Sequence, residues 1–162
     1  GTLYYMLKFS DISRPIIIHD LLQSKISKNW RFLRESFSLG QKIRFELKID
    51  PLELDVAQAV PLGLILNESI TNSIKYAFPE DRTGMIYVTL EATSQNKYLL
   101  TISDNGVGFD TTISAKKINS FGLSLIKGLS DDLDADYSIE NKNGTIIKIE
   151  FSKEFSINEK RR

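Results

Sequence analysis

The sequence predicts a two-layer α/β sandwich: a mixed, mostly antiparallel sheet with its helices packed on one face. Two observations carry this prediction. Stretches that alternate apolar and polar residues, as strands do, are interleaved with longer stretches whose apolar residues recur at helical spacing. In the second half of the chain, strands also follow one another across short polar turns, as antiparallel neighbours do. Counting one edge strand near the start, the expected order is β-α-β-α-β-β-α-β-β.

The N-terminal part of the chain is expected to form an edge segment, a helix and a half-buried strand. The opening LYYMLKFSDIS is apolar and then turn-like, so a short strand is expected there. A helix is expected over residues 14–37, where Pro15 is tolerated in the first turn and apolar residues recur at helical spacing. Pro51 ends the following strand, KIRFELKID. This strand places on one face Ile43, Phe45, Leu47 and Ile49.

The rest of the chain is expected to contain two helices and four strands. The helix LDVAQAVPLGLILNESITNSIKYAF is opened or kinked by Pro61 and stopped by Pro79. At about 100° per residue, its core-facing residues are Leu62, Leu66, Ile70, Ser73, Ile74 and Ala77. The later elements are the strands MIYVTLEA and KYLLTISD, a polar connection over 110–120, a helix FGLSLIKGLSDDL and a hairpin turning at Asn143-Gly144.

Composition bounds the class of protein. With 162 residues, the chain is long enough for one domain with a proper core. Lys plus Arg and Asp plus Glu number 21 each, so no overall charge points to nucleic acid or to a membrane surface. The absence of cysteine excludes disulfides, thiolate metal sites and a cysteine nucleophile. No apolar run has the length of a membrane span. A cytoplasmic domain is expected, and the start at Gly1 suggests a piece of a longer protein.

Four polar residues lie along one side of the helix that follows Pro61. Glu68, Asn72, Lys75 and Tyr76 fall within roughly a quarter turn, opposite the core-facing side. A solvated outer face is the ordinary explanation of such a stripe. Oxygen donors beside an ammonium group are also what a magnesium-bound polyphosphate requires, because Mg²⁺ takes one or two protein oxygens plus phosphate oxygens and water. On these residues alone, both interpretations stay open.

A glycine-rich stretch, SDNGVGFD, follows the strand that ends near Asp104. A turn explains it locally, because Gly tolerates positive φ and Asp and Asn side chains bond their own backbone. A binding site is the alternative, in which Asp104 accepts a hydrogen bond from an amine. Gly106 and Gly108 would then let the backbone pass close to a flat ligand. A dinucleotide-binding fingerprint would need a third glycine, and residue 111 is threonine.

The order and spacing of four motifs are more specific than any one of them. NESITNSIKYAF is followed by DNGVGFD, FGLSLI and NGT. The third begins a helix at Gly122, where free backbone N–H groups favour phosphate, and the fourth is a hairpin tip at Gly144 and Thr145. In this order they resemble the ATP-binding catalytic domain of two-component sensor histidine kinases. That domain belongs to the Bergerat-fold superfamily with gyrase, the mismatch-repair ATPases and the heat-shock chaperone ATPase. The resemblance runs from about Asp11 to Phe151.

The resemblance implies a Bergerat fold, ATP and Mg²⁺ as ligands, and phosphoryl transfer to a histidine. Asn72 would coordinate Mg²⁺, and Glu68 would take the polar or general-base position. Lys75 and Tyr76 would contact phosphates. The backbone around the third motif would line the phosphate side, through Gly122 and Leu123.

For the base, the resemblance implies a pocket around Asp104, which would bind the adenine amine. Gly106 and Gly108 would shape this pocket, and Thr145 would support Asp104 through water. Residues 110–120 would form a mobile lid over the nucleotide, carrying Lys116 and Lys117. This lid is short, no phenylalanine box is found in it, and Ser120 stands where many members have glycine.

The implied domain plan leaves the acceptor histidine outside this chain. Residues 1–10 are expected to be the end of the dimerisation and phosphotransfer hairpin or an edge segment, 11–152 the catalytic domain and 153–162 a charged tail. His19 is not expected to be the acceptor, because the strand KIRFELKID leaves no room for the second hairpin helix. The implied partners are ATP, the histidine hairpin of a homodimeric parent and a response regulator that acts through that hairpin, with no nucleic acid and no direct membrane contact.

Three alternative functions are considered. The first two share the fold with histidine kinases, and the third lacks nucleotide chemistry. In an ATPase of the gyrase or chaperone type, the acid at the position of Glu68 activates water. A serine-kinase anti-sigma factor binds a transcription factor and normally stands alone as a small protein. A nucleotide-free interaction module would have no need for Glu68, Asn72, Asp104 and the two glycines after it, all of which this sequence has.

Overall fold

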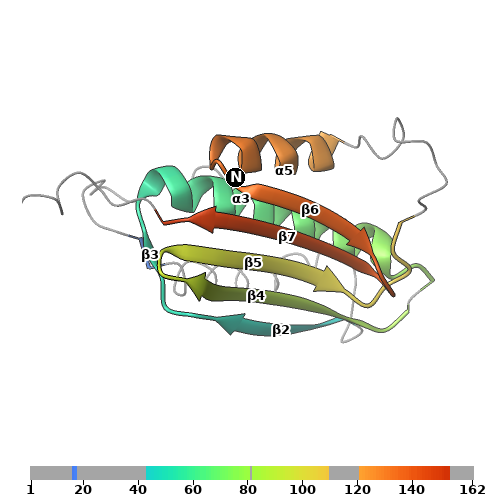
Figure 1. Ribbon diagram of the computed structural model, residues 1–162. Coiled ribbons are helices and arrows are strands. Elements are labelled where there is room, and N and C mark those ends of the chain that lie inside the picture. The colour runs from blue at the N-terminus through green and yellow to red at the C-terminus, as the bar shows by residue number, and fades with distance from the viewer. Residues whose placement is uncertain (1–15, 18–42, 81, 110–120, 154–162) are drawn as a thin grey trace, which may run out of the picture.

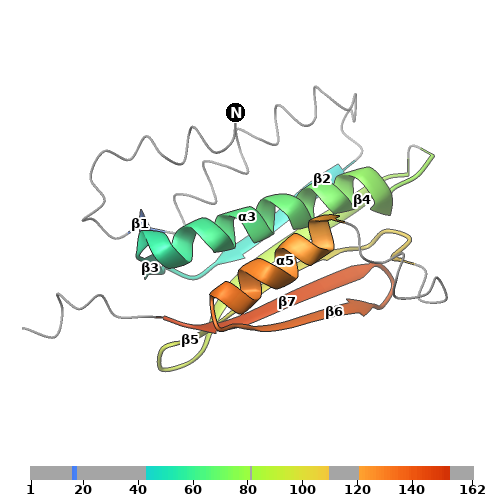
Figure 2. The same ribbon diagram turned by 90° about the horizontal axis from the view of Figure 1, so that it is seen from above.

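The computed structural model describes residues 16–17, 43–80, 82–109 and 121–153, most of which form two layers (Figure 1). One layer is a five-stranded sheet in the order β2-β4-β5-β7-β6. The other consists of the helices α3 and α5, which lie side by side over one face of the sheet (Figure 2). The two-layer α/β sandwich predicted from the sequence is confirmed.

The sheet is mixed and mostly antiparallel, as predicted. β2 pairs with β4 in parallel, and the other neighbours pair antiparallel. The strands are β2 (Ile43–Ile49), β4 (Gly84–Ser94), β5 (Lys97–Asp104), β6 (Asp136–Asn141) and β7 (Thr145–Ser152). The predicted strands KIRFELKID, MIYVTLEA and KYLLTISD and the C-terminal hairpin are therefore confirmed, and β2 ends before Pro51 as expected.

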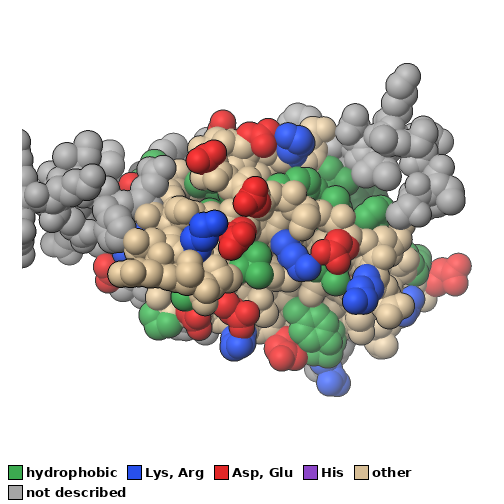
Figure 3. Space-filling view, viewed as in Figure 1, with side chains coloured by type: hydrophobic (Ala, Val, Ile, Leu, Met, Phe, Trp, Pro, Cys, Tyr) green, Lys and Arg blue, Asp and Glu red, His purple; other side chains and the backbone are tan. Residues whose placement is uncertain are grey.

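Alternation along each strand separates the two faces of the sheet. The inner face of the three central strands is fully buried, through Ile86, Val88, Leu90, Leu100, Ile102, Ile147, Ile149 and Phe151. The residues between them are partly exposed, because successive side chains of a strand point to opposite faces. On the face shown in Figure 3, acidic and basic side chains are interspersed with no large region of one sign. This agrees with the balanced composition.

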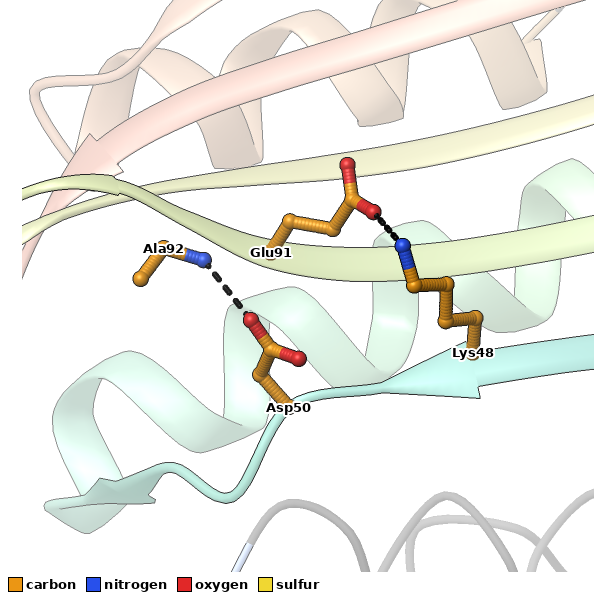
Figure 4. A network of polar contacts seen from close by, with 4 residues as sticks. All are labelled: Lys48, Asp50, Glu91 and Ala92. Atoms are coloured by element: carbon orange, nitrogen blue, oxygen red, sulfur yellow. Dashed lines mark hydrogen bonds and ion pairs between the residues drawn. The ribbon is translucent and has the colours of Figure 1, made fainter.

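Exposed polar contacts fix the end of the parallel β2–β4 pair (Figure 4). Lys48 forms an ion pair with Glu91 across the two strands. The Glu91 carboxylate raises the pKa of Lys48 through this hydrogen bond and through its charge. One residue pair further along, Asp50 accepts a hydrogen bond from the backbone N–H of Ala92 at 3.1 Å and donates its own N–H to the carbonyl of Leu90 at 2.8 Å. These contacts hold the register of the strand that leads into the first described helix.

That helix, α3 (Val56–Asn72), begins two residues later than the sequence pattern indicated. Asp55 caps it by accepting a hydrogen bond from the backbone N–H of Gln58 at 3.0 Å. Pro61 lies inside the helix and does not open it. Before the cap, Glu53–Leu54 forms a short strand, β3.

β3 pairs antiparallel with β1 (Ile16–Ile17), which corrects part of the predicted helix over 14–37. Consecutive β-branched isoleucines favour a strand, and here a partner strand is available to pair with them. The remainder of that predicted helix lies outside the described residues. So do the expected edge strand of the opening segment, the connection over 110–120 and the charged tail.

Five residues near the end of the predicted helix form a π-helix, η1 (Ser73–Ala77), which directly continues α3. A π-helical turn is wider than an α-helical one and is frequently found at functional sites. The six residues predicted to face the core are all buried: Leu62, Leu66, Ile70, Ser73, Ile74 and Ala77. The core-facing side was therefore predicted correctly, and the change of helix type was not.

The second helix of the layer is α5 (Phe121–Asp132), as predicted. It packs against α3, and its residue Ile126 is fully buried between the layers. The β6–β7 hairpin turns where expected: Asn143 has a φ of 53° and Gly144 a φ of 127°. Positive φ at both positions explains why Asn and Gly occupy this turn.

A candidate nucleotide site at the end of β5

Four segments distant in the sequence meet at one end of the two layers. They are the last turns of α3 with η1, the end of β5 with the loop after it, the first turn of α5 and the tip of the β6–β7 hairpin. The described residues of the four predicted motifs therefore lie together, as the resemblance requires.

Asp104 is the buried polar centre of this region. It is the last residue of β5 and shares the inner face with Leu100 and Ile102, because every second side chain of a strand points the same way. Its side chain is therefore directed toward the helix layer, and the residue is only 5% exposed.

Three donors from three different elements hold the Asp104 carboxylate. Oδ2 accepts a hydrogen bond from the Ser73 hydroxyl at 2.7 Å. Oδ1 accepts one from the backbone N–H of Gly106 at 3.0 Å and one from the backbone N–H of Thr145 at 3.2 Å. A carboxylate oxygen has two lone pairs, so Oδ1 is fully used and Oδ2 has one lone pair left.

The loop after β5 lies tightly against η1. The backbone N–H of Val107 donates to the carbonyl of Ala77 at 2.9 Å. A Cβ atom at Gly106 would lie 2.3 Å from that same carbonyl oxygen, so a side chain at this position would push the loop away from the helix. Gly106 is therefore required by a close approach of two backbones, beside the carboxylate that its own N–H contacts.

The same loop is held on its other side by β6. Gly108 has a φ of 69°, and a Cβ there would lie 2.2 Å from the side-chain oxygen of Asn141. The Asn141 amide nitrogen donates to the carbonyl of Phe109. The glycine-rich stretch is thus a loop clamped between η1 and the end of β6.

The hairpin tip presses on the end of β5 itself. A Cβ at Gly144 would lie 1.9 Å from the carbonyl oxygen of Asp104. This contact brings the next residue, Thr145, close enough for its backbone N–H to reach the Asp104 carboxylate directly. The predicted support of Asp104 by Thr145 through water differs from this contact, which is direct and made by the backbone.

At the opposite side of the site, Glu68 and Asn72 face the start of α5. A Cβ at Gly122 would lie 3.4 Å from Oε2 of Glu68, and 3.2 Å and 3.6 Å from Nδ2 and Oδ1 of Asn72. Both side chains are half-buried, and they come from successive turns of α3. Glycine therefore leaves room between the first turn of α5 and two polar side chains.

The donor set at Gly122 fits a magnesium ion that also binds phosphate. Within the part of the chain that the structure describes, no group of three or more His, Cys, Asp and Glu residues is placed to hold a metal. Side-chain oxygens of Glu68 and Asn72 lie close to one point beside Gly122. Mg²⁺ typically takes one or two protein oxygens and completes its shell with phosphate oxygens and water, so a sparse set of this kind is appropriate.

Of the other predicted residues, the described ones are on η1 and in the first turn of α5. Lys75 and Tyr76 are on η1 and exposed, and 68% of Tyr76 is accessible to solvent. Leu123 is in the first turn of α5 and is partly buried, and its side chain packs against the core. The lid residues Lys116 and Lys117, and His19, lie outside the described residues.

Sequence reasoning missed Ser73 as a site residue. It was placed correctly on the core-facing side of the helix, but not as a partner of Asp104. The available signal was a hydroxyl at a position where the neighbours Ile70 and Ile74 are apolar, since a buried hydroxyl needs a hydrogen-bond partner.

None of the helices in the described ranges is long and apolar enough to cross a membrane.

Known proteins resemble this chain in sequence and in fold. Residues 47–151 match the family described as histidine kinase-like ATPase domain. The blue-light-activated histidine kinase 2 of Erythrobacter litoralis (strain HTCC2594) is 23% identical over 109 residues, which cover 67% of this chain and 32% of that protein. An anti-sigma F factor of Heyndrickxia coagulans is 24% identical over 131 residues, covering 74% of this chain and 84% of that protein.

A solved structure has the same fold. The histidine kinase domain of a blue-light activated histidine kinase from Erythrobacter litoralis superposes with a TM-score of 0.70 at 20% sequence identity. The superposition covers 82% of this chain and 61% of that one. The chain spans about a third of the curated kinase that it matches, 32% of its length. On the family match over residues 47–151, this chain belongs to the histidine kinase-like ATPase domain family.

Proposed function

We propose that this domain binds Mg-ATP and transfers its γ-phosphoryl group to a histidine on a separate helical hairpin domain. Family membership supports ATP as the nucleotide. The observation that carries the proposal is the buried Asp104 carboxylate, which is fixed by three donors and retains one acceptor position on Oδ2.

The base would bind at Asp104. The exocyclic amine of adenine is a hydrogen-bond donor, and the free lone pair of Oδ2 is an acceptor held in one direction. Guanine carries a carbonyl oxygen at the same position of the ring and would face the carboxylate with an acceptor. Gly106 and Gly108 let this loop pack closely against η1 and Asn141, which holds the loop in place beside the carboxylate.

The phosphates would extend toward Gly122. The first turn of α5 is a helix N-terminus, where the helix dipole favours an anion. Asn72, with Glu68 beside it, would hold Mg²⁺, which when bound offsets the negative charge of the triphosphate. Lys75 and Tyr76 lie exposed on the adjoining π-helical turn, where an ammonium and a phenol can contact phosphate oxygens.

The reaction would be a direct phosphoryl transfer. An imidazole nitrogen of the acceptor attacks the γ-phosphorus, the bond to the β–γ bridging oxygen breaks, and ADP leaves. Glu68 is the general-base candidate for the proton that the imidazole gives up, and Lys75 would neutralise charge on the triphosphate. Positioning and charge neutralisation provide most of the catalysis in such reactions, which suits a site with few titratable groups.

The partners follow from this chemistry. The acceptor would be the histidine hairpin of a homodimeric parent, and a response regulator would receive the phosphoryl group from that hairpin. In the test, the purified chain is mixed with the hairpin domain of its parent and with labelled Mg-ATP. Acid-labile phosphate should appear on the hairpin and not on the chain alone. Phosphate on His19 of the isolated chain would contradict the proposal.

Asn72 provides the test of the metal assignment. Asn72→Ala should weaken the binding of Mg-ATP much more than the binding of adenosine, because adenosine binds without metal or phosphate. Asn67→Ala is the matched control, since Asn67 is a half-buried amide of the same helix on a different side. Equal weakening of both ligands by Asn72→Ala would make Asn72 a structural residue. Calorimetric titration measures both affinities.

A second candidate function is serine phosphorylation by an anti-sigma factor. The specific observation in its favour is the match to an anti-sigma F factor, of which this chain covers 84%. Phosphoserine is stable in acid whereas phosphohistidine is not, so the acid stability of the transferred phosphate separates the two. Rapid hydrolysis of ATP to free phosphate that Glu68→Ala abolishes would instead favour an ATPase of the gyrase type.

A further inference from the structure

Ser73 behaves differently from the other buried serines of the described helices. Ser69 and Ser130 donate their hydroxyls to the carbonyl four residues earlier, at 2.7 Å and 2.8 Å, which is the ordinary behaviour of serine inside a helix. Ser73 is also buried, at 8% exposure, yet its hydroxyl leaves the helix and donates to Asp104. The two residues are 31 positions apart in the chain.

This hydrogen bond determines what the Asp104 carboxylate can still do. The backbone N–H groups of Gly106 and Thr145 fix Oδ1, and the Ser73 hydroxyl fixes Oδ2. With both oxygens held, the carboxylate cannot rotate without breaking a buried hydrogen bond. The single free lone pair of Oδ2 is therefore held in one direction. Without Ser73, Oδ2 would offer two free lone pairs instead of one, and only the two bonds to Oδ1 would hold the carboxylate.

We propose that Ser73 is a positioning residue that makes the site select a base with an amine donor over the same base without one. The proposal rests on the proposed function, since it concerns how the bound base is read. Ser73 acts through Asp104, and no contact between Ser73 and the nucleotide is part of the proposal. Because it stands next to Asn72 in the sequence, the same short segment would serve the metal and the base.

The test compares two ligands that differ only in the amine. ATP and purine riboside triphosphate, which lacks the exocyclic amine, are titrated by calorimetry into the full chain and its variants. Ser73→Ala should weaken the binding of ATP about fivefold, which is the scale of one ordinary hydrogen bond. The affinity for the purine analogue should stay nearly unchanged. Ser73→Cys, with nearly the same volume and a weaker donor, should give an intermediate selectivity. It also serves as the test variant if Ser73→Ala does not fold.

Ser69→Ala is the matched control, one helical turn earlier and also buried, with a hydroxyl that does not reach Asp104. It should leave the ratio of the two affinities unchanged, and thermal unfolding should show that all variants fold. In an Asp104→Asn background, Ser73→Ala should no longer alter the ratio, because the two residues act as a unit.

The outcomes separate the inference from the proposed function. If the wild-type chain binds neither nucleotide, the proposed function fails and the inference with it. If the wild type prefers ATP but Ser73→Ala weakens both ligands equally, or neither, the inference alone is wrong. A change in the ratio caused by Ser69→Ala as well would also overturn it, because the effect would then come from helix packing.

Discussion

Replacing Asp104 by asparagine tests the centre of the site with little change in shape. The amide oxygen of the introduced side chain can keep both backbone donors that now bind Oδ1, from Gly106 and Thr145. The amide nitrogen takes the place of Oδ2, and the Ser73 hydroxyl rotates to accept from it instead of donating. The hydrogen-bond network is thereby preserved, and the position that faces the base changes from an acceptor to a donor.

The cost to the fold should be modest. Three hydrogen bonds to a charged group become neutral ones, a loss of about 1 kcal/mol each. A neutral amide is also less costly to bury than a carboxylate at a residue that is 5% exposed, which offsets part of this loss. The free energy of unfolding of Asp104→Asn should therefore fall by about 1–2 kcal/mol, measured by urea titration.

The effect on the nucleotide should be larger. ATP loses a hydrogen bond to a charged acceptor, which is worth about 2 kcal/mol. Its amine then faces the amide N–H donor of the asparagine, and leaving these donors without an acceptor costs about 1 kcal/mol more. Together these raise the Kd for ATP about 100-fold. Inosine triphosphate carries a carbonyl oxygen where ATP carries the amine, so the variant should bind it more tightly than ATP and thereby reverse the wild-type preference.

Calorimetric titration with both nucleotides provides the assay. Asp131→Asn is the control for charge, because Asp131 is an exposed residue paired with Lys127, and its replacement removes the same charge away from base recognition. Its nucleotide affinities should equal those of the wild type. A folded Asp104→Asn variant that binds ATP within about twofold of the wild type, with the order of the two nucleotides unchanged, would refute Asp104 as the base acceptor.

Three further predictions concern the framework of the site. Gly144→Ala should lower the free energy of unfolding by about 2–4 kcal/mol, because φ is 127° and a Cβ would lie 1.9 Å from a carbonyl oxygen of β5. In urea titration, Gly128→Ala in the open part of α5 should instead stabilise by about 0.5–1 kcal/mol. The hydrogen bond from Lys148 lowers the pKa of Glu140, so the pair contributes stability above pH 4.5 and loses it as pH falls through the lower folded-state pKa. Lys148→Met should reduce this acid dependence of the urea midpoint. Burial raises the pKa of Tyr137. The contribution of the protonated phenol to folding stability is therefore complete below pH 10.0 and is lost as pH rises through the higher folded-state pKa. Tyr137→Phe should reduce the loss of stability in alkali, again measured from the urea midpoint.

Each of these has a contradicting result. Equal stability changes from the two glycine variants would mean that the hairpin tip is not pressed against β5. An acid dependence that Lys148→Met leaves intact would assign it to other carboxylates. An alkaline midpoint that is the same for tyrosine and phenylalanine at position 137 would mean that this phenol is as solvated in the folded state as in the unfolded one.

The elements that could be predicted are those with a strong local period. Alternation in β2 and in the three strands at the centre of the sheet, and helical spacing from Leu62 to Ala77, report which side of an element is buried. Asn143 and Gly144 likewise indicated the hairpin turn. Where pairing with a distant segment competed with local periodicity, prediction was wrong: Ile16–Ile17 is a strand because β3 is beside it.

The sequence by itself determined the two-layer fold, the polar side of α3 and the residues that resemble a nucleotide site, because burial periodicity and motif order are properties of the chain read locally. The tertiary structure alone decided the π-helical turn at Ser73–Ala77, the direct contact of Thr145 with Asp104 and the hydrogen bond from Ser73. The two contacts of Asp104 join residues 31 and 41 positions apart. Their distances depend on how the helix layer sits on the sheet, and no local pattern encodes that.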